Sequence, residues 1–469
     1  MSLPNRHREV VPHGRRKERR TEQNENEHSN SSHHSTSRGR LYAPRSRASS
    51  RYSGASGRGT LQRMQSGFVI HLKRLILPVY LPMILVSVAI SAPVAAFPQY
   101  LAGLGASVAV VGIVISLRGV GNMVSDLPGG LILGRYRLRG VVQTALILAA
   151  AASAGMALVK SVVAIAILVL TTGAMASVVV TAMMTYVRLA VPADRRGRAL
   201  SLTGGSVRIG ALAGPILGGV LADLAGVPAA LLLRAGCFFA AFLVLLVSPD
   251  RDVDASGDDS IPVPHIRPGL RGQLGAIREG LRGKAHALAT VGFAILMLQL
   301  LRASRTIILP LWGDRLGLSA TLIGSVMSIG AALELALFVP SGVIMDRSGR
   351  KTAAALCIGI FSIGVFVLPF SVGVAGFVLA SLLIGLGNGF GAGINMTIGT
   401  DLAPSKAVSE FLGLWRLFGD VGTSAGPAIV GGIATAAGLP LAVGATAALG
   451  LLGLAALLIG PEPLRMADR

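Results

Sequence analysis

The sequence predicts an all-α membrane protein in which twelve transmembrane helices form two pseudo-symmetric six-helix bundles. Two observations carry this prediction, and an internal repeat described below carries the pseudosymmetry. The 469 residues are 52% hydrophobic and only 14% charged, whereas soluble domains carry about a quarter charged residues. The apolar runs are about 20 residues long, which fits spanning helices rather than the roughly 10-residue alternating strands of a barrel.

Twelve apolar runs are each long enough to cross about 30 Å of hydrocarbon. They lie at 75–98, 107–130, 141–159, 162–187, 200–223, 228–248, 287–311, 319–343, 352–371, 374–400, 409–434 and 439–460. Basic residues such as Arg188 and Arg347 follow the even-numbered runs, and few follow the odd-numbered ones. By the positive-inside rule we expect both termini to be cytoplasmic, in a multi-pass protein of the plasma (inner) membrane.

The net charge of +21 is concentrated outside the spans. Residues 1–74 hold sixteen Lys/Arg and five Asp/Glu, so this segment is expected to be a disordered basic cytoplasmic tail attracted to membrane lipids rather than to nucleic acid. Residues 249–285 are polar and Pro-bearing, and we interpret them as a cytoplasmic linker between an N-terminal bundle (75–248) and a C-terminal bundle (286–460). Residues 461–469 form a short cytoplasmic C-terminal tail in this interpretation.

The two predicted bundles repeat at one constant offset along the chain. The shift that places Pro98 on Pro310 also places Gly105 on Gly317. The same shift matches further positions in later spans: Pro128 with Pro340, Gly130 with Gly342, Gly214-Pro215 with Gly426-Pro427, and Gly226 with Gly438. A duplicated unit predicts two bundles about an axis along the membrane normal, with solute bound between them near the middle of the membrane.

Two motifs carry a family resemblance. "PSGVIMDRSGRK" at 340–351 matches P-x-G-x-x-x-D-R-x-G-R-K, the loop signature between spans eight and nine of the major facilitator superfamily. "GALAGPILGG" at 210–219 is similar to the span-five signature of the exporter branches, through Gly210, Gly214, Pro215, Gly218 and Gly219. Over residues 75–460 the chain therefore resembles a 12-helix, drug- or exporter-like member, and the resemblance implies the major facilitator fold.

The loop motif is expected to act as a cytoplasmic gate. Its residues are Gly342, Asp346, Arg347, Gly349, Arg350 and Lys351. Gly349 is expected at a turn where a side chain would strain the backbone. The resemblance implies that Asp346 accepts hydrogen bonds from the N-terminus of span five, a favourable site for a negative charge. We expect the three basic residues to hold phospholipid phosphates and the cytoplasmic ends of other helices.

Ionisable residues inside the spans are the candidate substrate and coupling groups, because such residues are costly in a membrane and usually face a cavity or a partner. They are Arg118, Asp126, Arg208, Arg302, Arg305, Glu334, Arg416 and Asp420, to which Asn388 is added as a polar group of span ten. Their depth, taken at about 1.5 Å per residue, predicts two pairs between the bundles, Arg118–Asp420 and Arg208–Glu334. An i,i+4 pair of Arg416 with Asp420 is the alternative.

Glu334 is the first candidate for proton coupling, because burial favours the neutral form of a carboxyl unless a cation offsets it. Arg302 or Arg305, if either faces the cavity, makes an anionic organic substrate plausible. The sequence shows no cluster of Cys, His or acidic residues with metal-ligand spacing, so we expect no metal and no cofactor. We also expect a monomer and no enzymatic activity, since no catalytic constellation or P-loop is found.

The leading functional prediction is secondary active transport of a small organic or drug-like solute by alternating access, as a proton-coupled exporter. Two alternatives remain open at this stage. One is uptake or facilitated transport of an organic anion. The other is a membrane sensor or scaffold with a transporter-like body that acts through its basic tail.

Overall fold

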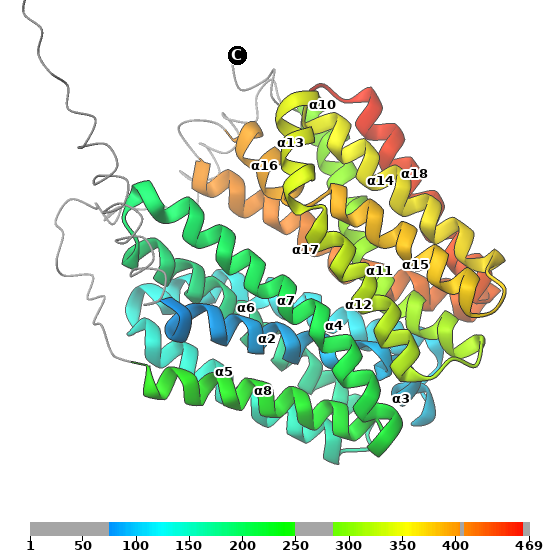
Figure 1. The fold of residues 1–469 in the computed structure, drawn as a ribbon, viewed down its shortest axis with the longest axis horizontal. Helices are drawn as coiled ribbons and strands as arrows, with labels where there is room; N and C mark the ends of the chain where they lie inside the picture. The colour runs from blue at the N-terminus through cyan, green and yellow to red at the C-terminus, as the bar shows by residue number, and fades with distance from the viewer. Residues whose placement is uncertain (1–74, 249–284, 404–407, 463–469) are drawn as a thin grey trace, which may run out of the picture. The chain divides into compact units, whose positions relative to one another are not determined.

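The computed structural model describes residues 75–248, 285–403 and 408–462, and side chains are not described at a few helical positions within these ranges. The predicted basic tail, nearly all of the predicted linker and residues 463–469 lie outside the described residues. Every regular element in the described ranges is helical (Figure 1).

The N-terminal bundle contains the first six spans. Its first span is built from four consecutive pieces and the other five are single helices. In chain order they are η1 (Ile76–Tyr80), α2 (Leu81–Ser91), η2 (Ala92–Ala95), α3 (Phe97–Gly103), α4 (Val108–Arg135), α5 (Leu138–Leu158), α6 (Val162–Ala190), α7 (Ala193–Ala225) and α8 (Val227–Val247).

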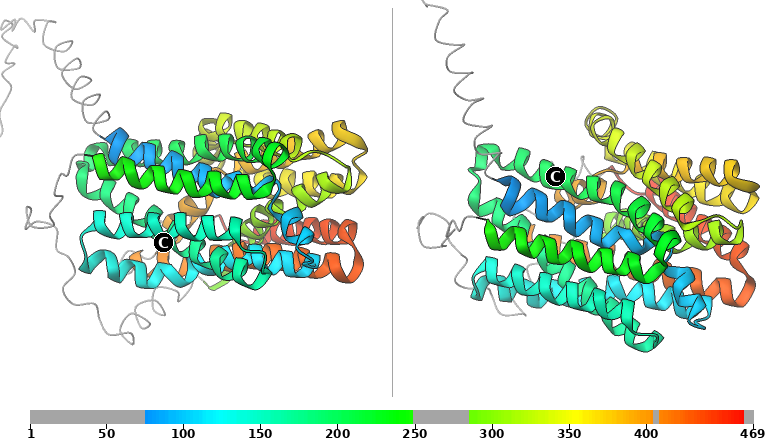
Figure 2. Two further views of the ribbon diagram at one scale, coloured as in Figure 1. Left: turned by 90° about the horizontal axis from the view of Figure 1, so that it is seen from below. Right: turned by 60° about the horizontal axis from the view of Figure 1, so that its bottom comes forward.

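The C-terminal bundle contains six further spans, of which two are interrupted. Its elements are α10 (Ala285–Ala287), η3 (Leu288–Gly292), α11 (Phe293–Arg315), α12 (Ala320–Ala336), α13 (Phe338–Ser348), α14 (Arg350–Val367), η4 (Leu368–Phe370), α15 (Gly373–Phe390), α16 (Ile394–Leu402), α17 (Val408–Ala437) and α18 (Leu439–Ile459). Figure 2 shows the same helices from two further directions, with α5 and α8 side by side.

Ten spans in the described residues are long and apolar enough to cross a membrane, and the bent pair α12–α13 makes an eleventh. The bend of 45° lies at Leu337, one turn before Pro340. Proline lacks an amide hydrogen and clashes with the carbonyl four residues earlier, which accounts for a bend there. With α17, which has 30 residues, the helices match the twelve predicted spans, and the predicted fold class is confirmed.

The predicted repeat is reproduced in the helix boundaries. α4 begins at Val108 and α12 at Ala320, and these two positions are related by the predicted offset. α8 and α18 obey the same offset at both of their ends. The turns before these last helices contain Gly226 with φ 81° and Gly438 with φ 89°. Only glycine adopts this backbone region without strain, so the two halves share their turn chemistry as well as their helix lengths.

Span ten is interrupted between α15 and α16, at Gly391–Gly393, where Gly393 has φ 81°. A break inside a membrane helix frees carbonyl groups that must find donors within the protein. Here Arg302 of α11 donates to the carbonyl of Gly391 at 2.9 Å. The span predicted at 374–400 therefore consists of two helices, and Arg302 binds a carbonyl at the break between them.

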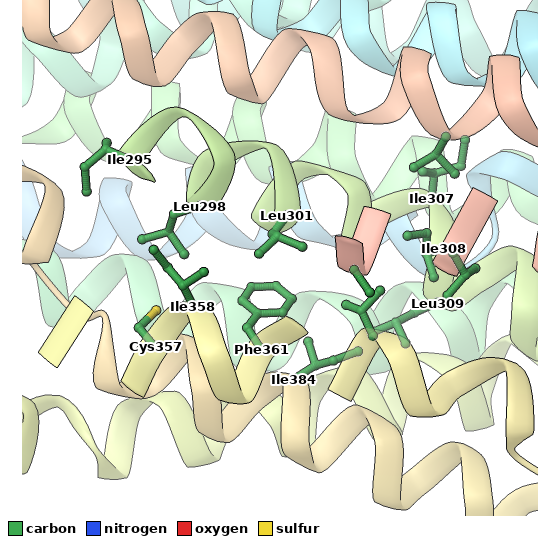
Figure 3. Packing of buried hydrophobic residues seen from close by; sticks show 14 of the residues in the cluster. Ile295, Leu298, Leu301, Ile307, Ile308, Leu309, Cys357, Ile358, Phe361 and Ile384 are labelled. Carbon is green, nitrogen blue, oxygen red and sulfur yellow. The ribbon is translucent and has the colours of Figure 1, made fainter. Parts of the chain in front are cut away.

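One apolar cluster lies within the N-terminal bundle, and a second fills the C-terminal bundle and continues into residues of α4 such as Val111 and Val114. In the C-terminal bundle, Leu298 and Leu301 of α11 pack towards Ile358 and Phe361 of α14 (Figure 3). All four side chains are fully buried. Lipid tails are as apolar as these side chains, so in a membrane such faces contribute through close packing rather than through exclusion from water.

Candidate functional site

A cavity of about 230 Å³ lies between the two bundles. Its wall is formed by α2, α4 and α7 from the N-terminal bundle and by α11, α12 and α15 from the C-terminal bundle, which are all visible in Figure 1. Both bundles must contribute to the cavity for a movement between them to change access to it. The sequence predicted solute binding between the bundles, and this cavity is the candidate site for it.

The cavity wall carries three guanidinium groups and one carboxylate. They belong to Arg118 of α4, Arg302 and Arg305 of α11, and Glu334 of α12. Arg305 forms an ion pair with Glu334. The remaining two arginines leave an excess of positive charge in a low-dielectric site, where electrostatic attraction for an anion is stronger than in water.

Arg302 is held by neutral groups. Its Nε donates to Asn388 Oδ1 at 2.6 Å, and its Nη1 donates to Gln299 Oε1 at 2.8 Å. Its Nη2 donates to the carbonyl of Gly391 at the break in span ten. Arg302 is therefore fixed in position while its charge stays uncompensated. Asn388, predicted as a polar group for substrate, acts in this structure as a support for Arg302.

The predicted pair of Arg118 with Asp420 is wrong. Arg118 lines the cavity and has no carboxylate within ion-pair distance among the described residues, whereas Asp420 lies beside Arg416, with 3.9 Å between Asp420 Oδ2 and Arg416 Nε. The alternative i,i+4 prediction for Arg416 and Asp420 is confirmed. The depth estimate fails here, because Asp420 lies at the level of Asp126 on α4, eight residues from Arg118.

The predicted pair of Arg208 with Glu334 is also wrong. Glu334 pairs with Arg305 inside its own bundle. Arg208 instead places its guanidinium 4.0 Å from the ring centroid of Phe338, at the start of α13. The bend at Leu337 presents this ring to α7, so the contact between bundles at this point is a cation–π interaction rather than an ion pair.

A second polar cluster crosses the contact between α4 and α17. Arg416 Nε lies 2.9 Å from Asp126 Oδ2 and 3.9 Å from Asp420 Oδ2. Ser177 of α6 donates to Asp126 Oδ1 at 2.6 Å. The sequence identified all three charged residues as candidates but did not pair Asp126 with Arg416.

Glycines let α4 and α17 approach closely at two levels beyond this cluster. A Cβ atom on Gly112 would lie 3.0 Å from the Cα of Gly431, and one on Gly119 would lie 3.1 Å from the Cα of Ser424. Small residues at such contacts allow backbones to pack without a side chain between them. Gly112, Gly119 and Asp126 follow one another at equal heptad intervals, so the ionic cluster continues the same face of α4.

The span-five signature has a packing explanation in this structure. A Cβ on Gly214 or Gly218 of α7 would collide with α2 or η2, and one on Gly219 would lie 2.8 Å from the carbonyl carbon of the first residue of α12. Gly210 makes the same kind of approach to α2. Pro215 lines the cavity. The motif thus lets α7 contact its own bundle and the opposite bundle at once.

Sequence reasoning missed two side chains that join the bundles at the far end, which is the end of the molecule where α7 and α17 finish. Asp223 of α7 accepts from the amide nitrogens of Ala320 and Thr321, at 3.1 and 2.7 Å. Thr435 of α17 accepts from the amide nitrogen of Ala109 at 2.8 Å. Each side chain caps the first turn of a helix in the opposite bundle, where amides lack intrahelical partners.

These two caps are equivalent under the repeat, because its offset relates Asp223 to Thr435 and also relates Ala109 to Thr321. The signal was therefore present in the sequence as an acceptor at matched positions near the ends of spans five and eleven. It could not be interpreted without knowing that each of these spans finishes beside the start of a helix from the other half.

Removing one cap is expected to loosen the far end. Loss of a capping side chain costs about 1 kcal/mol, which is roughly a five-fold change in a two-state population. Asp223→Ala should therefore lengthen the distance between spin labels attached at Leu158→Cys and Val372→Cys, two exposed far-end positions. Asp223→Asn, which keeps an acceptor oxygen, is the matched control. An unchanged distance distribution in Asp223→Ala would contradict a closing role for the cap.

The opposite end, called here the loop end, carries the predicted gating residues. Arg350 is the organising group: its Nε lies 3.0 Å from Asp401 Oδ2, and its Nη1 lies 3.3 Å from Asp346 Oδ1. The Asp346 side chain is 77% exposed, and among the described residues it does not make the predicted contact with the start of span five. Arg347 is exposed, and Gly349 has φ 92°, as its place in a turn requires.

Lys351 confirms the expectation that the basic residues hold helix ends. Its Nζ donates to the carbonyls of Leu458 and Gly460, each at 2.7 Å, at the end of α18. Arg139, its equivalent in the first half, donates to the carbonyl of Leu245 at 2.6 Å at the end of α8. Cations at a helix C-terminus are favoured by the helix dipole, and both bundles use this device to fasten their sixth span.

The described residues contain no group of three or more His, Cys, Asp or Glu side chains that could hold a metal ion. Cys237 and Cys357 are free and buried. The polar groups of the site are therefore arginines, carboxylates, amides and hydroxyls, which suit ion pairing and hydrogen bonding with a solute.

The fold and the site define a multi-pass helical membrane protein with a polar cavity between two repeated bundles. The sequence model of the Major Facilitator Superfamily matches this chain twice, at residues 79–298 and 291–468. The chain belongs to this superfamily and is a transporter of the corresponding fold.

Named relatives are distant. The enterobactin exporter EntS of Salmonella typhimurium is 27% identical over 369 residues, which cover 74% of this chain and 83% of the exporter. The arabinose-proton symporter of Bacillus subtilis is 30% identical over 112 residues, which cover 24% of this chain and only 22% of the symporter.

Solved structures share the fold at lower identity. The nucleoside transporter NupG aligns with a TM-score of 0.63 at 16% identity, covering 83% of this chain and 98% of that chain. A POT family transporter in complex with a thioalcohol-conjugated peptide aligns with a TM-score of 0.67 at 13% identity, covering 81% and 94%. At such identities the likeness concerns the fold alone.

Proposed function

We propose that this protein exports a small organic solute by alternating access, with protons as the coupling ion, across the plasma (inner) membrane and with both termini cytoplasmic. The observation that carries the proposal is the cavity whose wall comes from both bundles. A relative movement of the bundles would open that cavity to one side or the other. The span-five signature and the likeness to an enterobactin exporter support the outward direction, and the partial likeness to a proton symporter supports proton coupling.

The charge of the cavity favours a solute that carries a negative group. Arg118 has no carboxylate partner among the described residues, and Arg302 is held only by neutral acceptors. Guanidinium groups bind carboxylate and phosphate in a bidentate geometry. In this proposal Arg118 from one bundle and Arg302 from the other would bind the anionic group together, which links solute binding to closure of the bundles.

A comparison of accumulation in cells with and without the protein tests this proposal. The compounds are matched pairs of aromatic carboxylates and their neutral amides, and each is followed at equal external concentration. We expect cells with the protein to retain less of the carboxylates and equal amounts of the amides. Arg118→Gln should abolish the difference, whereas Lys160→Gln, an exposed residue between α5 and α6, should leave it unchanged.

Each part of the proposal has a result that would contradict it. Equal export of carboxylates and amides would exclude the anion preference. Accumulation that rises when the protein is present would reverse the direction. Export that persists after the proton gradient is collapsed in inside-out vesicles would exclude proton coupling.

A further inference from the structure

The cluster of Asp126, Arg416 and Asp420 contains two carboxylates for one guanidinium, unlike the ion pair in the cavity wall. Both carboxylates lie within 4 Å of the same atom, Arg416 Nε, at 2.9 and 3.9 Å. Arg305 and Glu334, in contrast, form a one-to-one pair. Two carboxylates with one guanidinium carry a net charge of −1, and like charges sharing one site disfavour the doubly ionised state. One proton on either carboxyl would bring the cluster to neutrality.

The surroundings of the cluster supply no second cation among the described residues. The ion pairs of Asp126 and Asp420 are both made with Arg416. From the neighbouring α6 the facing polar group is the hydroxyl of Ser177, which is neutral. Arg118 is on the same helix as Asp126 but about 12 Å further along it, at about 1.5 Å per residue, on the wall of the cavity.

The helices packed against α17 add only neutral groups near the cluster, as far as the structure describes them. α11 and α16 bring the amides of Gln299 and Asn395 close to Gly419, the residue before Asp420. Both Asp126 and Asp420 have side chains that are only 19% exposed. A proton on the pair is therefore the available route to charge balance.

The repeat offers an internal comparison. Its offset makes Phe338 the equivalent of Asp126 and Arg208 the equivalent of Asp420. Phe338 and Arg208 also meet, with the guanidinium 4.0 Å from the ring centroid. The two halves thus keep a contact between bundles at the same place, but only the α4–α17 side contains carboxylates. That contact can change its charge with proton binding, and its counterpart between α7 and α13 cannot.

We infer that Asp126 and Asp420, bridged by Arg416, form the proton-binding site of this transporter, in place of Glu334. The inference rests on the proposed proton coupling and names the site for it. The proton comes from water and binds one carboxylate oxygen, so the cluster changes from −1 to neutral and no other bond changes. The neutral cluster holds Arg416 less strongly than the doubly ionised one, which loosens the contact between the bundles and links proton binding to their movement.

Infrared difference spectroscopy tests the site without a transported solute. The full chain is reconstituted in phosphatidylcholine vesicles, and spectra are compared between alkaline and acidic buffer in the range of the protonated carboxyl C=O stretch. The expected band is one buried carboxylic acid that appears on acidification. Asp420→Asn should abolish it, and Asp126→Asn should abolish or strongly shift it. Glu334→Gln and Asp314→Asn, the latter exposed at the end of α11, should leave it in place.

Changes at Arg416 separate a proton site from a merely structural cluster. Arg416→Lys keeps the cation and should retain a band of similar intensity. Arg416→Gln removes the cation and leaves two carboxylates together, so the protonated band should appear already in more alkaline buffer. Monodisperse elution of each variant on size exclusion shows that it is folded, and if Asp126→Asn fails this control, Asp420→Asn and Arg416→Gln still decide the question.

A band that persists in both Asp420→Asn and Arg416→Gln without a shift, or that disappears in Glu334→Gln, would overturn the inference. The proposed function is tested separately by solute flux in vesicles with and without a proton gradient. Flux of the wild type that ignores the gradient would contradict the proposed coupling even with the band present at Asp420. A gradient response that survives in Asp420→Asn would contradict the site alone.

Discussion

Replacement of Glu334 by Gln is expected to destabilise the protein substantially, because it leaves Arg305 as an unpaired charge. The two side chains are 24% and 19% exposed, so the pair is largely buried. Removal of one partner of a buried pair costs roughly 3–5 kcal/mol, and the partial exposure here places the expected loss near the lower end. Thermal unfolding of the purified protein in nanodiscs, followed by circular dichroism, measures the effect.

A double variant provides the control for this prediction. Arg305→Gln combined with Glu334→Gln removes both charges, so no group is left uncompensated, and it should be more stable than Glu334→Gln alone. Asp314→Asn, at an exposed carboxylate, should change the unfolding temperature little. Strictly additive losses from the two single changes would show that the pair does not contribute as a unit.

Replacement of Arg350 by Gln is expected to have a similarly large effect at the loop end. The Arg350 side chain is 15% exposed and contacts Asp401, whose side chain is 18% exposed. It also donates to the carbonyl of Met345 at 2.8 Å. The substitution therefore leaves a buried carboxylate unpaired, and each such group is expensive. We expect a clear loss of thermal stability and a lower yield of folded protein.

The neighbouring arginine is a close control for Arg350. Arg347→Gln changes an exposed residue three positions earlier, with the same loss of one charge from the loop. It should alter the unfolding temperature much less. Equal effects of the two substitutions would mean that the loop acts through its overall charge, as a topology signal, rather than through the contacts of Arg350.

The fold was predictable because its signals are local or repeated. Apolar runs indicated the spans, and one constant offset indicated the duplication. The turn glycines Gly226 and Gly438 obey that offset in both sequence and backbone geometry. The bend of 45° between α12 and α13 was not predicted. Pro340 marks it, but many membrane helices contain proline without such a bend, because neighbouring groups satisfy the freed backbone.

The members of the site were predictable, but their partners were not. Charged side chains are energetically unfavourable inside a membrane, so those found there are functional candidates. This reasoning selected every charged group in the cavity wall. Pairing depends on the relative height of facing helices and on the direction of each side chain, and residue counts from the predicted span ends fixed neither. Asp126 and Arg416 illustrate this, since they meet at 2.9 Å although depth alone favoured Arg118 as the partner across α4 and α17.

The central claim is that the two bundles move about the cavity so that one end closes as the other opens. In this structure the far end is joined, since Asp223 caps α12 and a Cβ on Gly324 would collide with the carbonyl of Pro215. At the loop end Asp346 faces solvent. A leucine at Gly324 should therefore force the far end apart and shift the bundles towards the opposite arrangement.

The most direct test measures two distances between spin labels in Gly324→Leu and in the wild type. Leu158→Cys with Val372→Cys reports the far end, and Val247→Cys with Ile459→Cys reports the loop end; all four positions are exposed. The account predicts that the far-end distance lengthens while the loop-end distance shortens. A longer far-end distance combined with an unchanged or longer loop-end distance would contradict the claim. So would the absence of any change in both distances.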